Sequence, residues 1–237
     1  MSNEILLIVS LIIIYGLTLL WWALFGKAGL YAWAAFVAIA ANIEVLILVE
    51  AFGFEQTLGN ILFATTFLTT DILSENVGKH IAKKAVNIGI LTSASFIVVS
   101  QLWLLYTPAY YDFVHPHIVG VFTNTPRVMF AGFIVYAIVQ RFDVFLYHHL
   151  WSLTERKTGN RRKLLWFRNT VSTMISQLIN TVLFTLGAFL GVFDRDTLIS
   201  IMIVTYVIFM ITALADTPVA YLGRRIHEWK QKKSTAA

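Results

Sequence analysis

Seven ionisable side chains lie within stretches that are otherwise apolar, and these residues are the best placed in the sequence to do chemistry. Six are acidic and one is basic: Glu44, Glu50, Asp71, Glu75, Arg141, Asp143 and Asp216. An ionised side chain at the centre of a bilayer costs about 2.5–3.5 kcal/mol on insertion scales, so such a residue usually faces a partner or a cavity. We therefore predict a polar layer where several apolar segments converge.

Asp71 and Glu75 are four residues apart, which places both carboxylates on one face of a helix. Two like charges at this spacing repel each other unless one is protonated or a cationic or hydrogen-bonding ligand lies between them. Asp216 stands eight residues before a cation, as Asp71 does. Eight residues of helix span about 12 Å, so both carboxylates are expected near the middle of an apolar core of about 30 Å.

Interhelical salt bridging is the alternative to a binding role for these acids. It is most attractive for Asp143, because Arg141 is only two residues away. We therefore predict that Arg141 and Asp143 form a structural ion pair.

A polar stripe formed by Ser176, Gln177, Asn180 and Thr181 interrupts a later apolar segment. The hydroxyl side chains suit plain contacts between helices. Gln177 and Asn180 are larger, and each offers both a donor and an acceptor, which suits a planar ligand with amide-like edges.

The elements that must position these residues are membrane spans. The chain has 237 residues, of which 58% are hydrophobic and 13% charged, against roughly 45–50% and 25% in soluble domains. This composition excludes a water-soluble globule, a disordered chain and a nucleic-acid-binding surface. We predict an all-α polytopic membrane protein with about seven spans, the third being the weakest because acids interrupt it. The predicted spans are residues 4–25, 29–52, 60–78, 86–106, 126–150, 169–191 and 197–222.

The cations predict the orientation of these spans. Numbering the loops in order and placing alternate loops on one side gathers 15 of the 18 lysines and arginines there. Cytoplasmic loops carry this excess. We therefore expect the N-terminus outside and the C-terminus in the cytoplasm of a multi-pass membrane protein.

Several kinds of chemistry lack a scaffold in this sequence. Cysteine is absent, which excludes thiolate metal sites and cysteine nucleophiles. No His-Glu-x-x-His, Gly-x-Ser-x-Gly or P-loop pattern occurs. An intramembrane enzyme working through the aspartates is a weak alternative. We expect no enzyme, no cofactor and no metal site.

Four segments together resemble one family. The segment Thr66-Phe-Leu-Thr-Thr-Asp-Ile-Leu-Ser-Glu-Asn-Val-Gly-Lys is similar to an acidic stretch of that family. Trp166-Phe-Arg-Asn, with the polar stripe that follows it, is similar to its sixth-span signature. Residues 143–145 and 215–218 also fit. The combination resembles the VUT (YhhQ) family of queuosine precursor transporters over roughly residues 29–225.

The resemblance implies an inner-membrane carrier for a 7-deazapurine such as 7-cyano-7-deazaguanine, its aminomethyl relative or queuine. It implies a six-helix transporter core (28–226), an additional N-terminal helix (1–27) and a basic cytoplasmic tail (227–237). The expected partners are this small molecule and the lipid bilayer, with no nucleic acid, and a homo-oligomer is left open. The substrate-binding candidates are Asp71 and Glu75 first, then Gln177, Asn180, Asn42 and Asp216, with Glu44 as an acid that the family pattern does not have.

This sequence departs from the family pattern at three positions. The family commonly has lysine where Ile47 and Phe209 stand, and aspartate where Asn180 stands. The joint loss at positions 180 and 209 predicts that these positions face each other between the last two spans. Two other functions are weighed against transport: a substrate-binding subunit of a multi-component vitamin importer, and a membrane structural protein with no transported ligand.

Overall fold

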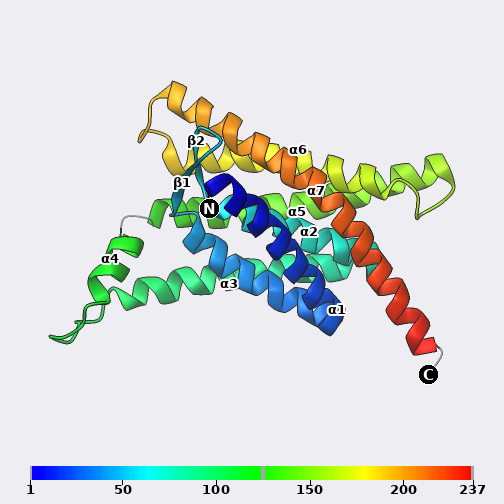
Figure 1. Cartoon of the computed structure of the whole chain (residues 1–237), viewed down its shortest axis with the longest axis horizontal. Coiled ribbons are helices and arrows are strands. Elements are labelled where there is room, and N and C mark those ends of the chain that lie inside the picture. Colours follow the sequence, from blue (N-terminus) through cyan, green and yellow to red (C-terminus); the bar gives the residue numbers. More distant parts are fainter. Residues whose placement is uncertain (1, 124–125, 236–237) are drawn as a thin grey trace.

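The computed structural model describes residues 2–123 and 126–235. Within these residues the chain forms seven helices and one two-stranded sheet, which confirms the all-α prediction in outline (Figure 1). Five of the described helices, α1, α3, α5, α6 and α7, are long and apolar enough to cross a membrane. The elements in order are α1 (Asn3–Glu44), β1 (Leu48–Ala51), β2 (Phe54–Thr57), α2 (Gly59–Asn76), α3 (Lys79–Trp103), α4 (His115–Thr123), α5 (Pro126–Thr158), α6 (Leu165–Phe189) and α7 (Arg195–Thr235).

Helix α1 is a helical hairpin rather than one rod. Its 42 residues would extend about 63 Å if straight, twice the thickness of the apolar core. Gly26 breaks it with φ 58° and ψ −137°, a conformation that glycine adopts readily and other residues rarely. A Cβ at Gly29 would lie 2.2 Å from the Trp21 carbonyl oxygen, so glycine is also needed for the close approach at the turn. The two arms of α1 therefore correspond to the first two predicted spans.

The second predicted span was too long. Residues 48–57 form a β-hairpin with Leu48 opposite Thr57, and its turn contains Phe52 and Gly53, both at positive φ. Two hydrogen bonds hold this hairpin against the N-terminal residues. The Asn3 side-chain amide donates to the Glu50 backbone carbonyl at 2.8 Å, and the Phe52 N–H donates to the Glu4 carboxylate at 3.1 Å. Glu50 is therefore an exposed strand residue and not part of a long apolar helix.

Helix α2 is the centre of the bundle. Fifteen of its 18 residues are buried, and it packs against α1, α3, α5 and α7. This position explains how a helix with two acids and four threonines is accommodated, because its polar side chains face neighbouring helices and not lipid. The outward faces of the longer helices are apolar instead, with exposed side chains such as Ile12, Leu91 and Leu214.

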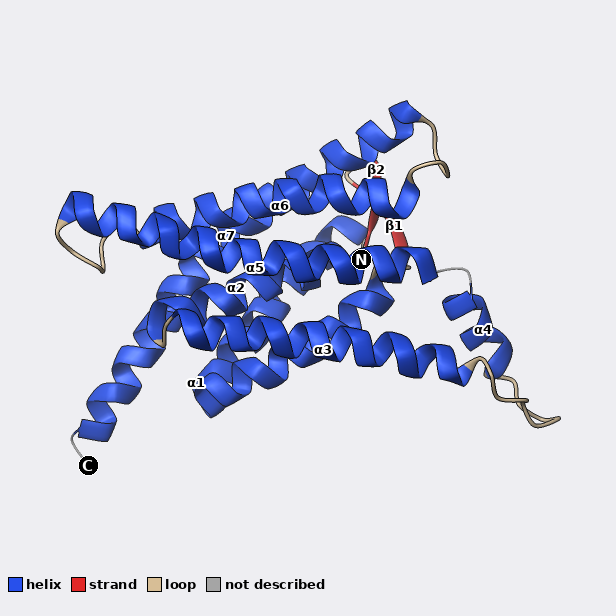
Figure 2. Ribbon diagram, turned by 180° about the vertical axis from the view of Figure 1, so that it is seen from behind, coloured by secondary structure: helices blue, strands red, loops and turns tan. Residues whose placement is uncertain are grey.

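The bundle has two chemically different ends (Figure 2). At one, which we call the hairpin end, lie the N-terminus, β1, β2, α4 and the α6–α7 connection. At the other, the basic end, lie the turn of α1, the α5–α6 connection and the C-terminal part of α7. Lys230 donates to the Trp22 carbonyl at 3.2 Å, and Arg162 pairs with Glu228 at 3.3 Å, which ties these three segments together.

Two further helical features were not predicted from the sequence. Helix α4 is a short helix between α3 and α5. Helix α7 continues well past residue 222, so the predicted basic tail is helical as far as Thr235.

Candidate functional site

The polar face of α2 runs through the middle of the bundle. Thr65, Thr66 and Thr70 donate to backbone carbonyls three residues earlier, at 2.7–2.8 Å. Such local bonds satisfy a hydroxyl donor without a partner on another helix. The threonine oxygens remain able to accept, and Thr66 accepts a hydrogen bond from the buried amide of Gln140 on α5.

Three carboxyl side chains from three helices lie next along this path: Asp71 from α2, Asp143 from α5 and Asp216 from α7. We call them the carboxyl triad. Each is at most 1% exposed. Thr173 on α6 donates to Asp71 Oδ2 at 3.4 Å. Within the described part of the chain, the other five carboxyl oxygens of the triad have no hydrogen-bond partner at ordinary distance.

One face of α6 lines the same region. Asn169, Thr173 and Gln177 follow one another at intervals of four residues, and all are buried. The amides of Asn169 and Gln177 have neither oxygen nor nitrogen partnered by described residues. Buried amides are normally hydrogen-bonded, so this face has unused capacity to bind a polar molecule.

A cavity of about 90 Å³ lies between this region and the hairpin end. Its amide lining comes from Asn42, Asn60 and Asn180. Its walls are aromatic and include Phe63, Phe133, Tyr136, Phe184 and Phe209. Aromatic faces and amide edges are the complementary surfaces for a flat heterocycle.

The cavity and the carboxyl triad are connected through α2. Thr66 lines the cavity, and Asp71 is five residues further along the helix, a rise of about 7.5 Å. Glu75 follows one turn later, towards the basic end. Helix α2 therefore carries polar side chains at successive depths, from the cavity to the basic end.

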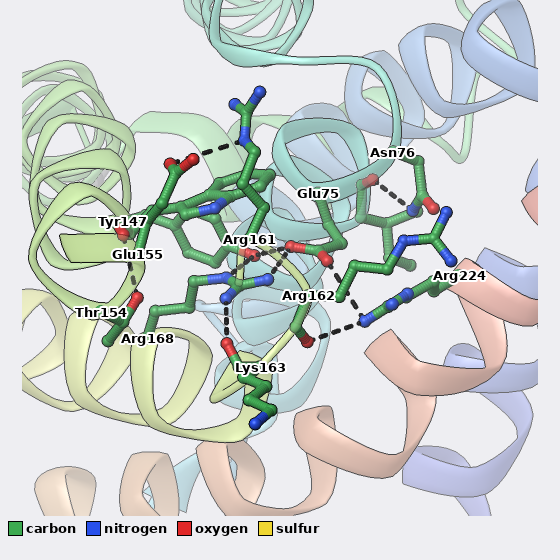
Figure 3. Close-up of polar contacts among 12 residues, drawn as sticks. Glu75, Asn76, Tyr147, Thr154, Glu155, Arg161, Arg162, Lys163, Arg168 and Arg224 are labelled. Carbon is green, nitrogen blue, oxygen red and sulfur yellow. Dashed lines mark hydrogen bonds and ion pairs between the residues drawn. The ribbon is translucent and has the colours of Figure 1, made fainter. Parts of the chain in front are cut away.

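An ion-pair network closes this path at the basic end (Figure 3). Glu75 lies between Arg168 of α6, with which it pairs, and Arg224 of α7, at 3.7 Å. The Tyr147 hydroxyl donates to Glu75 at 3.0 Å, and Arg168 also donates to the Lys163 carbonyl at 2.9 Å. The Glu75 and Arg168 side chains are 4% and 0% exposed. This network joins four helices around one buried carboxylate.

The backbone just before α6 aims Arg168 into the network. Leu164 has φ 58°, a left-handed conformation that is rare for a residue other than glycine. The Arg168 guanidinium lies over the Trp151 ring, 4.5 Å from its centroid, which adds a cation–π contact.

The structure distributes the predicted site residues over three places. Asn42 and Asn180 line the cavity. Asp71, Asp216 and Gln177 lie in the buried polar region, whereas Glu75 belongs to the ion-pair network. Glu44 is the half-buried last residue of α1 and does not line the cavity.

The expected pair between Arg141 and Asp143 is not formed. Arg141 is exposed and donates to Asn87 at 3.3 Å, while Asp143 is fully buried. The reason is geometric: residues two apart on a helix do not face each other. The basis for the prediction was closeness in sequence, which is the wrong measure on a helix.

Sequence reasoning missed several residues of the site. Arg168 was noted as part of the Trp166-Phe-Arg-Asn segment but was not among the candidate site residues. No sequence pattern marked Tyr147 or the aromatic cavity walls as site residues, because aromatic residues are common throughout the chain. Gln140 was not marked either, because its partner lies far away in sequence.

An apolar helical bundle, with five described helices long and apolar enough to cross a membrane and polar residues buried among them, is the architecture of a multi-pass membrane protein. The family described as "Putative vitamin uptake transporter" matches residues 57–223. A Bacillus subtilis (strain 168) protein named "Probable queuosine precursor transporter" is 36% identical over 226 residues, covering 95% of this chain and 96% of that protein. No solved structure matches the chain significantly. The chain belongs to this vitamin uptake transporter family, which confirms the resemblance.

Proposed function

We propose that this chain imports a queuosine precursor, a 7-deazapurine, across the cell inner membrane. The observation that carries the proposal is the cavity in which amides from three helices meet aromatic walls. A deazaguanine offers a flat face for the aromatic rings and a carbonyl and N–H edge for Asn42 and Asn180. The name of the 36% identical relative supports the same substrate class.

The proposed path starts at the cavity and follows α2. Substrate binds between Asn42 and Asn180, near the hairpin end, and then passes the buried amides of Gln177 and Asn169. Release occurs at the basic end when the network around Glu75 opens. In the present conformation Glu75 forms ion pairs with Arg168 and Arg224 at this end. Release of the substrate therefore requires a conformational change that separates these pairs.

We infer the orientation of the protein in the membrane from its charge distribution. Under the positive-inside rule the basic end is cytoplasmic and the hairpin end is outside. We accordingly propose seven membrane passages: the two arms of α1, then α2, α3, α5, α6 and α7. Helix α2 crosses as the covered central helix.

A host that cannot make queuosine provides the test. Cells expressing this chain alone are fed 7-cyano-7-deazaguanine, its aminomethyl relative or queuine, and queuosine is measured in their tRNA. We expect queuosine to appear with at least one precursor, and to fall in Asn180→Leu at unchanged protein level when the precursor is limiting. Recovery that requires an added ATPase partner would indicate a binding subunit of a multi-component importer. Absence of queuosine with every precursor would refute the proposal.

A further inference from the structure

We propose that the carboxyl triad, Asp71, Asp143 and Asp216, is a coupling site for a small monovalent cation, a proton or Na⁺, that moves inward together with the substrate. The inference rests on the proposed function, because a coupled cation needs a transported partner. It concerns a different place in the molecule, since none of the three side chains lines the cavity.

Charge balance is the first argument. Among the described residues, the buried carboxylate of Glu75 forms ion pairs with two cations, Arg168 and Arg224, whereas no carboxyl group of the triad forms a salt bridge. The arginine nearest to Asp143 in sequence, Arg141, is turned to Asn87. A buried carboxylate without a counter-charge is strongly disfavoured. A positive charge supplied from solution therefore has to accompany the triad.

Mutual repulsion strengthens this argument. The Asp71 carboxyl group interacts electrostatically with the carboxyl groups of Asp143 and Asp216, and also with that of Glu75. Three neighbouring carboxyl groups in one low-dielectric region cannot all remain ionised unless a proton or cation binds to at least one of them. The other titratable groups around the triad are Tyr15 of α1, Tyr147 of α5 and Arg168 of α6, and both the arginine and Tyr147 are already engaged with Glu75.

The neighbouring polar groups suit a small cation. Thr173 contacts Asp71, while Ser176 lies beside Asp143 and Tyr15 beside Asp216. Gln177 is one turn beyond Thr173 on the same face of α6, is fully buried, and has an unpartnered amide oxygen and nitrogen. Carboxyl, hydroxyl and amide oxygens are the ligands of hard cations, and hydroxyl groups also relay protons.

A multivalent metal does not fit the same groups. Within the described ranges, no three histidine, cysteine, aspartate or glutamate side chains are close enough together to hold a metal ion. The three carboxyl groups therefore do not converge on one point, and each has its own hydroxyl neighbour. One proton or Na⁺, held by a single carboxyl with neighbouring hydroxyl and amide oxygens, is the charge that fits this arrangement.

The location of the triad allows it to couple the two ends of the path. On α2, Asp71 is about 7.5 Å from the cavity residue Thr66 and about 6 Å from the network residue Glu75, measured as helical rise. A cation at Asp71 consequently changes the field at both places. Differential binding of a cation to the closed and open states is the physical requirement for coupling.

Purified protein in liposomes separates this inference from the proposed function. The probe is labelled 7-cyano-7-deazaguanine, measured first as exchange at equal concentrations and then as accumulation under an inward proton or Na⁺ gradient. One cation moved down a tenfold gradient can drive about tenfold accumulation, since each tenfold costs the same free energy. We expect accumulation with one of the two gradients, which identifies the cation.

Asp143→Asn is the matched variant, with Glu155→Gln as the exposed control. We expect Asp143→Asn to keep exchange and lose gradient-driven accumulation, whereas Glu155→Gln keeps both. Exchange by the wild-type protein without accumulation under either gradient overturns the inference and leaves the proposed function intact.

A second readout needs no substrate. The melting temperature of the purified protein is compared between NaCl and choline chloride, and between acidic and alkaline buffer, because a ligand that binds the native state stabilises it. We expect the response to one cation to be reduced in Asp143→Asn, or in Asp216→Asn if the first variant does not fold. Identical responses in wild type and variants overturn the coupling site even if no probe is transported.

Discussion

Breaking the buried network at the basic end gives the sharpest prediction of a measurable free energy. The change is Glu75→Gln, which keeps the shape of the side chain and removes its charge. Arg168, whose side chain is 0% exposed, is then left buried without a counter-charge. Removing one partner of a buried pair costs about 3–5 kcal/mol. We expect the free energy of unfolding to fall by this amount, measured by tryptophan fluorescence during denaturation in mixed detergent.

The chain supplies its own control for this measurement. Arg161 and Glu155 form an ion pair at 3.6 Å whose side chains are 70% and 44% exposed. Breaking an exposed pair costs about 0–1 kcal/mol, so Glu155→Gln should unfold almost like the wild type. Equal destabilisation by the two variants would refute the reasoning, because it would mean that burial does not determine the strength of these pairs.

The same variant tests whether the network is a gate. Because the chain has no cysteine, Ser74→Cys introduces a single thiol one residue before Glu75, at a site that is 1% exposed. Loss of about 1.4 kcal/mol of closing free energy is enough for a tenfold change. We expect an impermeant maleimide added at the basic end to label this thiol at least about tenfold faster in Glu75→Gln. An unchanged labelling rate would show that the network does not close the path.

Two further predictions concern the cavity. A Cβ at Gly89 would lie 2.0 Å from the Tyr136 hydroxyl, so Gly89→Ala should displace this ring from the cavity wall. We expect this variant to be less stable by about 1–3 kcal/mol and to take up substrate more weakly. Gly120→Ala, where the added Cβ meets open space, should have neither effect, and equal melting temperatures for the two variants would contradict this prediction. Phe209→Lys should destabilise the protein by placing a charge in the cavity, and adding Asn180→Asp should recover a substantial part of the lost stability. If the loss of stability in the double variant equals the sum of the losses in the two single variants, these positions are not in contact.

The sequence predicted the long helices well because their apolar runs are unmistakable. The bilayer imposes length and composition on every exposed span, so the bounds of α3, α5 and α6 follow within several residues. The β-hairpin was missed for a physical reason. Val49 and its neighbours continue an apolar run that suits either a strand or a helix. The tight turn at Gly53 and the hydrogen bond from the Phe52 N–H to Glu4 favour the strand, and neither is visible as a local apolar pattern.

The site was predicted in part, and the errors have a common cause. Asp71 and Asp216 were placed near each other from depth alone, and the structure brings both into the buried triad. Glu75 and Arg168 are 93 residues apart, so no local pattern could pair them. The division into an N-terminal helix and a six-helix core, and the orientation of the termini, stay predictions. The N-terminal arm nevertheless donates from Trp22 to the Gly223 carbonyl at 2.8 Å, which packs it against α7.

Uptake of labelled 7-cyano-7-deazaguanine by liposomes containing only this purified chain tests the central claim most directly. We predict saturable uptake that is competed by the aminomethyl relative or queuine. Replacing the cavity amide in Asn180→Leu should weaken apparent affinity by roughly 5–150-fold, the equivalent of a lost buried hydrogen bond of about 1–3 kcal/mol. Asn87→Leu, at an exposed amide on α3, should behave as the wild type. Uptake no faster than in protein-free liposomes, for this probe and both competitors, would contradict the account.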